Sequence, residues 1–499
     1  MSHVPAERVR AANDAPVRRD GEHVLVWTTA FRRTSWNFTL DRAVEWATEL
    51  HRPVLVLEAL RAGYPHASDR LHAFVLQGMA DSARAYADAG IGYHPYVEPA
   101  PGAGRGLLAA LAARACVVVT DDAPFFFLPR MLAAAAGRLP VRVEAVDGNG
   151  LLPVRLAPTT FPTAYAFRRF IQAELPERLS AFPSTDPLDA DGAAGANVPD
   201  EVSSRWPRAT PDLLSASAAA LRALPIDHGV APVPDARGGS VAGRAVLASF
   251  LGERLPRYLE RSHPDVDGSS GLSPWIHFGQ VSTHEIFRAL ARHEAWKPAR
   301  LGAGCRGKRE GFWGMSPQAE SFLDQLVTWR EVGFNMLARR PEAAHDFGSL
   351  PPWAIRTLEA HAGDRRDPLY GREALERAAT HDEVWNAAQR ELLERGRIHN
   401  YLRMLWGKKI LQWSASPREA LATMLHLNDR WALDGRDPSS ASGIFWCLGR
   451  YDRPWAPERP VLGVVRYMSS ENTVRKLKLK AYLRRFGAQP GLPIGRPPR

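Results

Sequence analysis

The chain has 499 residues, of which 45% are apolar and 24% are charged, a composition typical of a water-soluble globular protein with about two domains. Its formal net charge of +10 permits binding to a polyanion without requiring it. Cys116, Cys305 and Cys447 lie far apart with no CxxC spacing, which argues against a disulfide framework or a zinc site.

The chain contains no apolar run of about 18 residues, so we expect no membrane-spanning helix. Residues 1–22 are polar and lack the apolar core of a secretory signal. We therefore expect residues 1–22 to form a disordered lead-in and the protein to be cytoplasmic.

Residues 23–180 alternate short apolar runs with stretches of helical spacing. Continuous apolar strands between helices indicate a parallel sheet covered on both faces, so we predict a doubly wound α/β domain. The segment has no GxGxxG or Walker motif. The predicted strands are His23–Thr28, Pro53–Leu57, Tyr93–Val97, Cys116–Thr120 and Val141–Val146, and the predicted helices are Leu40–Leu50, Ala67–Ala89, Gly106–Ala115 and Phe127–Gly137.

Proline, alanine, serine, aspartate and glycine dominate residues 181–240, which predicts an interdomain linker with a short helix near Pro211–Leu224. Residues 241–486 are helical in pattern almost throughout, and residues 487–499 are expected to form a disordered tail. The predicted helices of this second domain are Gly243–Arg254, Ser282–Arg292, Ala319–Asn335, Trp353–Ala362, Thr380–Arg395, His399–Gln412 and Pro417–Asp429.

Four stretches combine residue types that carry chemistry. The first runs from Tyr258 through the small residues before Pro274, and it offers hydroxyls and backbone N–H groups to a phosphate. An ordinary capped loop explains the same residues. The second stretch contains Trp406 and Trp413, which lie two helical turns apart, with Trp385 on the preceding helix. Three such indoles suit an electron relay, although core packing of aromatics is the commoner reason for such a pattern.

The third stretch, Leu427–Pro438, is rich in polar residues and is interpreted as a loop leaving a helix. Its carboxylates can pair with Arg403 and fix the polar edge of a cofactor, or they can form weak surface ion pairs. The fourth is basic and comprises Lys408, Lys409 and the cluster from Arg475 to Arg485. These side chains either contact phosphates or cover a solvated helix face.

Five long segments, in this order, closely resemble the class II branch of the photolyase/cryptochrome family. They are GLSPWIHFGQVS, THDEVWNAAQ, YLRMLWGKKILQW, LNDRWALDGRDP and ERPVLGVVRYM, and the likeness extends from about His23 to Arg485. The resemblance implies an α/β antenna domain followed by an all-helical domain that holds FAD. It also implies light-driven repair of cyclobutane pyrimidine dimers in DNA by a deoxyribodipyrimidine photo-lyase.

The resemblance assigns roles to individual residues. By its pattern, Tyr258, Ser269, Ser270, Leu272 and Ser273 hold the FAD phosphates, while Arg403 and Asp434 pair against the flavin ring and Asn428 lies near flavin N5. Trp406, Trp385 and Trp413 match the electron relay from its proximal to its distal end. The residues expected to contact the lesion or its DNA are Gln325, Trp329, Met404, Trp446, Lys408 and Lys409.

A dimer inside a duplex cannot reach a buried flavin, so it must be flipped out and stacked on aromatic walls. The expected partner is therefore ultraviolet-damaged DNA, bound by a monomer. Besides FAD, the resemblance implies an antenna pigment of the deazaflavin type, and no metal.

Two departures from the family pattern bear on function. Gln325 stands where the family usually has a glutamate that contacts the dimer, and Gly271 replaces a larger polar residue. Either Asp324 supplies the carboxyl through a register shift of one, or the lesion contacts are altered. Gln325 favours the rival interpretation, a non-repairing flavin photoreceptor of the cryptochrome kind. A third interpretation, repair of (6-4) lesions, requires a pocket histidine, for which His277 is the candidate.

Overall fold

The computed structural model describes residues 4–189 and 195–488. The chain divides into two compact units. The first comprises Met1–Pro256, Ser270–Ala344 and Arg436–Ser439, and the second comprises Arg257–Ser269, His345–Gly435 and Ser440–Arg499. The predicted boundary near residue 240 does not coincide with this division, because the first unit keeps the helices up to Ala344. The predicted linker includes five undescribed residues, 190–194, and the predicted tail lies outside the described residues from 489 onward.

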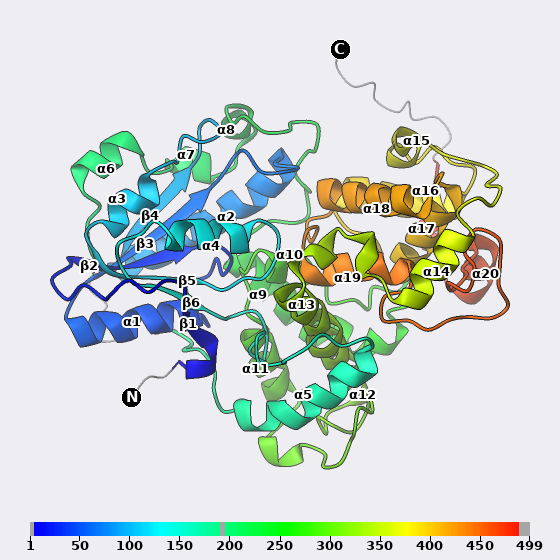
Figure 1. Ribbon diagram of the computed structural model, residues 1–499, viewed down its shortest axis with the longest axis horizontal. Coiled ribbons are helices and arrows are strands. Elements are labelled where there is room, and N and C mark those ends of the chain that lie inside the picture. The colour runs from blue at the N-terminus through cyan, green and yellow to red at the C-terminus, as the bar shows by residue number, and fades with distance from the viewer. Residues whose placement is uncertain (1–3, 190–194, 489–499) are drawn as a thin grey trace. The chain divides into compact units, whose positions relative to one another are not determined.

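The first unit is built on a sheet of six strands in the order β1-β6-β5-β2-β3-β4 (Figure 1). All neighbouring strands are parallel except β1 and β6, which pair antiparallel, so the predicted parallel sheet is mixed at one edge. Each predicted strand is confirmed within a few residues. The strands are β1 (Val9–Ala11), β2 (His23–Thr28), β3 (Val54–Leu60), β4 (Gly92–Val97), β5 (Ala115–Asp121) and β6 (Val143–Val146).

Alternate side chains of the strands point to opposite faces, and helices cover both. Val24 and Val26 of β2 pack with α1 and α2, whereas Leu25 and Trp27 pack with α3 and α4. This arrangement confirms the doubly wound architecture. The helices are α1 (Phe38–Leu50), α2 (Asp69–Asp88), α3 (Leu107–Ala112) and α4 (Leu128–Ala136).

The prediction of a disordered lead-in over residues 1–22 is wrong for the described part, residues 4–22. Strand β1 pairs with β6, and Val4 and Arg8 are buried. The Arg8 guanidinium donates to the carbonyls of Asp147, Gly150 and Leu151. The polar composition gave no signal for this strand, because it has only three paired residues and the buried side chain beside it is an arginine, Arg8.

The remaining part of the first unit is helical. Within the predicted linker, Trp206 packs on the sheet core and its indole N–H donates to the Ala103 carbonyl at 3.0 Å. The segment is therefore ordered where it is described. The helices are α5 (Ala164–Arg178), α6 (Asp200–Arg205), α7 (Pro211–Leu214), α8 (Ala218–Arg222), α9 (Ser240–Ser249), α10 (Ser273–His277), α11 (Thr283–His293), α12 (Pro317–Leu323) and α13 (Arg330–Arg339).

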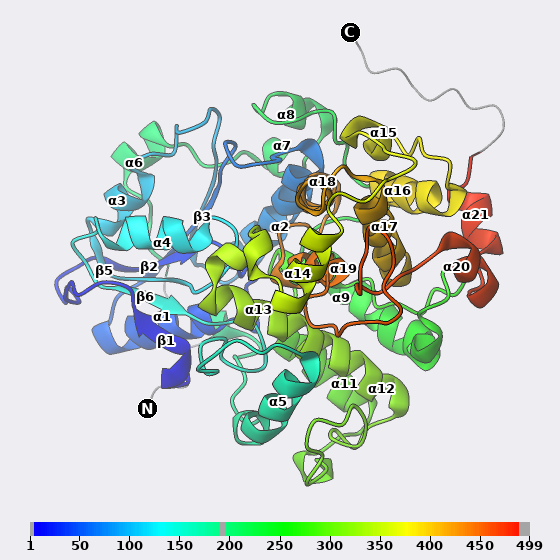
Figure 2. The same cartoon turned by 45° about the vertical axis from the view of Figure 1, so that its right-hand side comes forward.

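The second unit is all helical. Helices α16 and α18 pack against α17, and α21 packs against α16 (Figure 2). Their shared core contains Trp385, Trp406 and Trp413, each at most 4% exposed. The helices are α14 (Pro352–Ala360), α15 (Arg372–Glu376), α16 (Glu383–Arg395), α17 (Asn400–Trp413), α18 (Pro417–Trp431), α19 (Pro438–Cys447), α20 (Ser470–Lys476) and α21 (Lys480–Phe486). Across residues 4–189 and 195–488, no helix has both the length and the apolar character needed to cross a membrane.

Candidate functional site

An arginine and an aspartate from separate elements of the second unit meet in a half-buried ion pair. Arg403, on α17, approaches Asp434 with 3.3 Å between Nη2 and Oδ1, and the two side chains are 14% and 13% exposed. Its other terminal nitrogen lies 3.5 Å from the hydroxyl of Ser440. Both contacts are long, and a guanidinium has five N–H donors, so donor capacity remains for a further acceptor.

Ser440 connects this pair to Asn428. Its hydroxyl donates to Asn428 Oδ1 at 3.0 Å, and the buried Asn428 amide donates in turn to Asp429 at 2.9 Å. The sequence did not predict a role for Ser440, although this serine follows Asp434 by only six residues. The predicted helix Pro417–Asp429 is confirmed as α18, which ends two residues later at Trp431 and holds Asn428 in its last turn.

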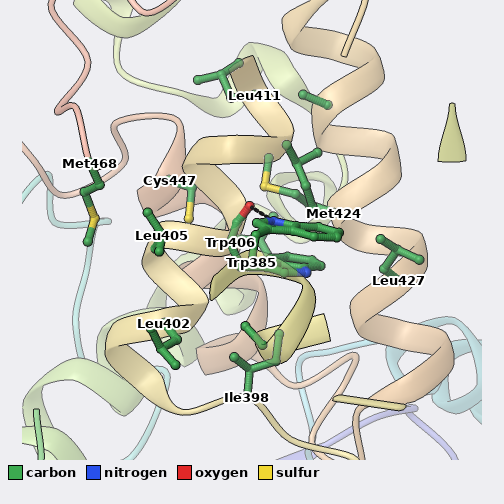
Figure 3. Close-up of a cluster of buried hydrophobic side chains, with 14 of the residues drawn as sticks. Trp385, Ile398, Leu402, Leu405, Trp406, Leu411, Met424, Leu427, Cys447 and Met468 are labelled. Atoms are coloured by element: carbon green, nitrogen blue, oxygen red, sulfur yellow. Dashed lines mark hydrogen bonds between the residues drawn. The ribbon is translucent and has the colours of Figure 1, made fainter. Parts of the chain in front are cut away.

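Three tryptophans form a ladder beside this polar cluster. The rings of Trp406 and Trp385 are parallel within 1°, with centroids 6.5 Å apart, and the Trp385 ring lies 5.6 Å from that of Trp413 at 70°. The Trp385 indole N–H donates to the Trp406 carbonyl at 3.0 Å (Figure 3). Trp406 donates to the side chain of Gln389 at 2.9 Å. Trp385 is therefore the middle member, as the predicted relay requires.

The capped start of α16 explains how the ladder is held. The Asp382 carboxylate accepts the backbone N–H of Trp385 at 3.0 Å, which begins the helix three residues later than the predicted Thr380. Because Arg403 and Trp406 are three residues apart on α17, they are neighbours on its surface. The ladder therefore begins next to the Arg403–Asp434 pair.

The prediction that Lys408 and Lys409 contact DNA phosphates is wrong. Lys408 is fully buried, and its ammonium donates to the carbonyl of Cys447 at 2.6 Å. Burial lowers the pKa of Lys408 to about 8. Lys409 is 8% exposed and pairs with Asp382 at 3.5 Å. The sequence did not reveal the burial of these two lysines, because charge density alone does not show which face of a helix packs against the core. The basic side chains from Arg475 to Arg485 are exposed.

The predicted phosphate-binding residues divide between the two units. Tyr258, which is buried, and Ser269, which is half-buried, belong to the second unit. Ser270, Leu272 and Ser273 belong to the first, where the Leu272 N–H lies 3.5 Å from the Ser270 hydroxyl. Gly271 has a φ of +68°, a conformation that glycine adopts without strain. A glycine therefore suits the backbone at this position.

Two predicted lesion-contact residues share one face of a π-helical turn, Asp324–Trp329, between α12 and α13. Gln325 and Trp329 are four residues apart and both are half-buried. Asp324 is buried and receives a hydrogen bond from Arg168 at 2.7 Å. The register shift that would put Asp324 in the place of Gln325 is therefore excluded, and Gln325 stands at the accessible position. π-helical turns are frequent at functional sites.

The other two lesion-contact residues lie in the second unit. Met404 packs against its core, and both Met404 and Trp446 are half-buried. The ring of Trp446 has Lys408 Nζ at 5.2 Å and Arg466 Cζ at 5.7 Å from its centroid. These contacts hold the indole in one orientation while leaving part of it accessible.

Sequence reasoning also missed a cavity of about 440 Å³ in the first unit. Residues at or just beyond the carboxyl ends of β2, β3 and β4 line it, among them Trp27, Ala59 and Glu98. The phenylalanine triplet that follows β5, Phe125–Phe127, closes another side. The chain direction across the sheet reverses between β2 and β5, and crevices at such switch points bind ligands in α/β proteins. The one sequence feature that pointed to this cavity was the triplet FFF after a buried strand.

Arginines give this cavity a positive lining. Arg61, Arg105, Arg138 and Arg436 all line it, while Arg32 is paired with Glu58 at 2.6 Å. The Arg436 guanidinium lies 5.8 Å from the Tyr64 ring centroid and 5.5 Å from that of Phe126. The cavity therefore combines flat aromatic walls with cationic groups, which suits a planar ligand with an acidic group.

His277 also lines this cavity. Its Nδ1 lies 3.4 Å from the carboxylate of Asp437. Burial raises the pKa of Asp437, but His277, the Arg330 charge and the backbone N–H of Ser439 together outweigh burial and leave that pKa below its usual value. His277 is thus part of the sheet-edge cavity, which removes the support for the (6-4) interpretation. In the part of the chain that the structure describes, no group of three or more His, Cys, Asp or Glu side chains is arranged to hold a metal ion.

Comparison with known proteins gives full-length relatives. The chain is 32% identical over 492 residues to a deoxyribodipyrimidine photo-lyase of Methanothermobacter thermautotrophicus, covering 97% of this chain and 98% of the relative. It is 33% identical over 483 residues to a deoxyribodipyrimidine photo-lyase of Oryza sativa subsp. japonica, covering 93% and 87%. No family model matches the chain.

Solved structures show the same fold. A bacterial class III photolyase from Agrobacterium tumefaciens superposes with a TM-score of 0.67 at 18% identity, over 93% of this chain and 86% of that one. An archaeal photolyase from Sulfolobus tokodaii, described with two FAD molecules, gives a TM-score of 0.63 at 14% identity, over 93% and 90%.

Proposed function

Because the chain belongs to the deoxyribodipyrimidine photo-lyase family, we propose that it uses light and reduced FAD to split cyclobutane pyrimidine dimers in ultraviolet-damaged DNA. The observation that carries this proposal is the polar cluster of Arg403, Asp434 and Asn428 placed next to the first indole of the tryptophan ladder. A polar edge beside an electron path is what a photoreducible ring cofactor requires.

The residues present fit FAD. Arg403 keeps unused N–H donors in a half-buried place, and Asp434 opposite it is an acceptor. Asn428, buried and fixed by Ser440, offers an amide to a ring nitrogen. Tyr258, Ser269, Ser270, Leu272 and Ser273 are proposed to hold the phosphates. When bound, the flavin supplies the electron that opens the dimer.

The chain's own residues orient the reactants and exclude water. Arg403 and Asp434 fix the polar edge of the ring, while Trp406, Trp385 and Trp413 pass an electron inward when the cofactor must be reduced. Trp329 and Trp446 are proposed to stack on extruded bases, with Met404 and Gln325 in contact with them. Stacking on an indole contributes roughly 1–3 kcal/mol per base, which offsets part of the cost of extrusion.

We assign the cavity of the first unit to an antenna pigment. Its volume of about 440 Å³ lies in the range of ligand pockets, and its phenylalanine and tyrosine walls suit a flat conjugated ring such as a deazaflavin. The arginines favour a pigment bound as an anion.

Gln325 supports the second candidate, a flavin photoreceptor that does not repair DNA. An amide donates hydrogen bonds but cannot share a proton with a lesion carbonyl, and the accessible position has no carboxyl. The two candidates agree on FAD and on the tryptophan ladder, and they differ in dimer splitting.

One experiment separates them. Purified protein with reduced FAD is illuminated in the presence of ultraviolet-damaged oligothymidine, and the return of thymine absorbance is followed. Recovery in the light and none in the dark is the expected result. Bound, photoreducible FAD without any recovery would identify the photoreceptor, and a colourless protein would overturn both candidates.

A further inference from the structure

A segment of the second unit, residues 452–467, packs closely on the C-terminal half of α14. Its tip is a tight turn in which the Arg459 nitrogen lies 3.0 Å from the Gly463 oxygen, and the Gly463 nitrogen lies 2.7 Å from the Arg459 oxygen. A Cβ at Gly463 would clash with the Thr357 hydroxyl and with the ring of His361. The 452–467 segment therefore approaches α14 at a distance that only a glycine permits.

The imidazole of His361 bridges two carboxylates across this contact. Its Nδ1 lies 2.6 Å from Asp364 Oδ2, just beyond α14, and its Nε2 lies 2.9 Å from Glu458 Oε1 in the 452–467 segment. Asp364 Oδ2 also accepts the Val461 N–H at 2.7 Å. Because ionised carboxylates only accept hydrogen bonds, both ring nitrogens must donate, which requires the imidazolium form. His361 therefore fastens the segment to the end of α14 in its charged form.

Two arginines near this bridge contact other groups. Arg366 donates to three backbone carbonyls just after α14, at 2.9, 3.0 and 3.4 Å. Arg459 lies over the ring of Tyr467, at 4.7 Å from its centroid. The charged groups that face the imidazole are therefore the two carboxylates, and the hydrogen bonds to Glu458 and Asp364 raise the pKa of this imidazole above its ordinary value. The bridge is present below the raised pKa and is lost as pH rises through it.

The 452–467 segment supports a proposed lesion wall through one arginine. The Arg466 guanidinium lies 5.7 Å from the ring centroid of Trp446 and 4.8 Å from that of Trp455, so it contacts both indoles. The Trp455 N–H donates to the Val464 carbonyl at 2.8 Å, which ties the second indole to the same segment. A cation beside an indole is attracted to its ring. Release of the segment would therefore withdraw Arg466 and leave Trp446 less firmly held.

We propose that His361 is a positioning residue for lesion binding, because its charged bridge holds the 452–467 segment in place. The fixed segment keeps Arg466 against Trp446, and the indole keeps the orientation in which it stacks on an extruded base. When the imidazole loses its proton, one ring nitrogen becomes an acceptor that faces a carboxylate, and the exposed Glu458 is released. Affinity for damaged DNA therefore falls as pH rises. This inference rests on the function proposed above for Trp446.

The first test follows the segment itself, in the holoenzyme without DNA. Hydrogen exchange of the peptide that contains Val461 is measured by mass spectrometry at neutral and at alkaline pH, and each rate is divided by the intrinsic rate at that pH. Protection is expected to fall at alkaline pH in the wild type and to be low at both pH values in His361→Gln. The matched control is His345→Gln, at an exposed histidine of the same unit, and it should keep the wild-type profile. Equal protection in His361→Gln and the wild type would overturn the inference.

The second test measures lesion binding. The dissociation constant for ultraviolet-damaged oligothymidine is determined for the holoenzyme over the same pH range, together with the repair yield at saturating DNA. His361→Gln is expected to bind roughly fivefold more weakly at neutral pH, the effect of losing one cation–indole contact, with little change in the yield per bound dimer. In Glu458→Gln the amide can accept from a charged ring or donate to a neutral one, so binding should stay tight and lose its pH dependence.

The outcomes separate this inference from the proposed function. Release of the segment without a change in lesion affinity contradicts the inference alone, and so does a pH dependence that persists unchanged in Glu458→Gln. Wild-type holoenzyme that binds no damaged DNA at any pH defeats the inference and the proposed function together. Glu458→Gln alters a side chain that is 60% exposed, so this arm of the test remains decisive even if His361→Gln folds poorly.

Discussion

Arg168 on α5 donates to Asp324 at 2.7 Å, and this buried pair determines which side chain of the neighbouring π-helical turn reaches the surface. With Asp324 held inward, Gln325 and Trp329 are the accessible members of the turn. Because Asp324 is paired with Arg168, the accessible side chain of this turn carries the amide of Gln325 and not a carboxyl.

Gln325→Glu is expected to raise the quantum yield of dimer repair, because a carboxyl at this position can share a proton with a lesion carbonyl. Repair is measured with damaged oligothymidine and pre-reduced protein. An unchanged or lower yield would show that the amide is suited to the lesion as it stands.

The neighbouring substitution Asp324→Asn is the structural control for this experiment. It leaves Arg168 buried without its counter-ion and should cost about 3 kcal/mol of unfolding free energy. A stability loss in Asp324→Asn without one in Gln325→Glu would separate the structural from the functional carboxyl position.

Trp406→Phe should abolish light-driven reduction of FAD, since it interrupts the stacked pair with Trp385 at 6.5 Å. Illumination in the presence of a thiol, followed by flavin absorbance, measures this. Dithionite should restore repair to the variant, because chemical reduction bypasses the ladder. Undiminished photoreduction in Trp406→Phe would mean that electrons reach the flavin by another route.

Arg403→Ala should lower FAD occupancy, with a loss of about 2 kcal/mol or more in binding, because a half-buried charged hydrogen bond is removed and Asp434 is left unpaired. Arg403→Lys should recover only part of it, since an ammonium cannot form the planar fork. The flavin-to-protein absorbance ratio reports the result. Arg365→Ala, at an 88% exposed side chain, is the control. Equal occupancy in Arg403→Ala and this control would remove the pair from the cofactor site.

Lys408 predicts a pH dependence of stability. Burial lowers its pKa from 10.5 to about 8, so between these values the unfolded chain binds the proton that the folded chain has released. Stability relative to Lys408→Met should therefore rise with pH through this range, by about 3 kcal/mol in total. Urea unfolding of both proteins below, within and above the range measures the difference, and a difference independent of pH would contradict the lowered pKa of Lys408.

Ala59→Trp should fill the sheet-edge cavity, because Ala59 lines it at the end of β3. The variant is expected to lose the antenna pigment and its absorption band while it keeps FAD. Ala134→Trp, on the exposed side of α4, is the matched control and should keep both. Pigment bound equally well by Ala59→Trp would place the antenna elsewhere.

Local patterns predicted most of the fold. The strands His23–Thr28 and Cys116–Thr120 were visible because a strand covered on both faces must be continuously apolar. Strand β1 was invisible, because its pairing depends on Arg8 reaching three carbonyls more than a hundred residues away. The short π-helical turns at Phe250–Arg254 and Asp324–Trp329 likewise gave no sequence signal.

The candidate site was predicted in part. Spacing along α17 put Trp406 and Trp413 on one face, and the carboxylate of Asp434 was paired with Arg403 from polar density and family likeness. Ser440 and the burial of Lys408 depend on which helix packs on which, and no local pattern encodes that.

The antiparallel strand β1 also has a practical consequence. The polar composition of residues 1–22 could suggest a shortened gene that starts near His23. Such a truncation would remove β1, the partner of β6, and expose the edge of β6 with its unpaired N–H and C=O groups. Such an edge can pair with a second molecule, so the shortened protein is expected to aggregate during expression. Fusion tags are better attached ahead of residue 4 than inserted into this strand.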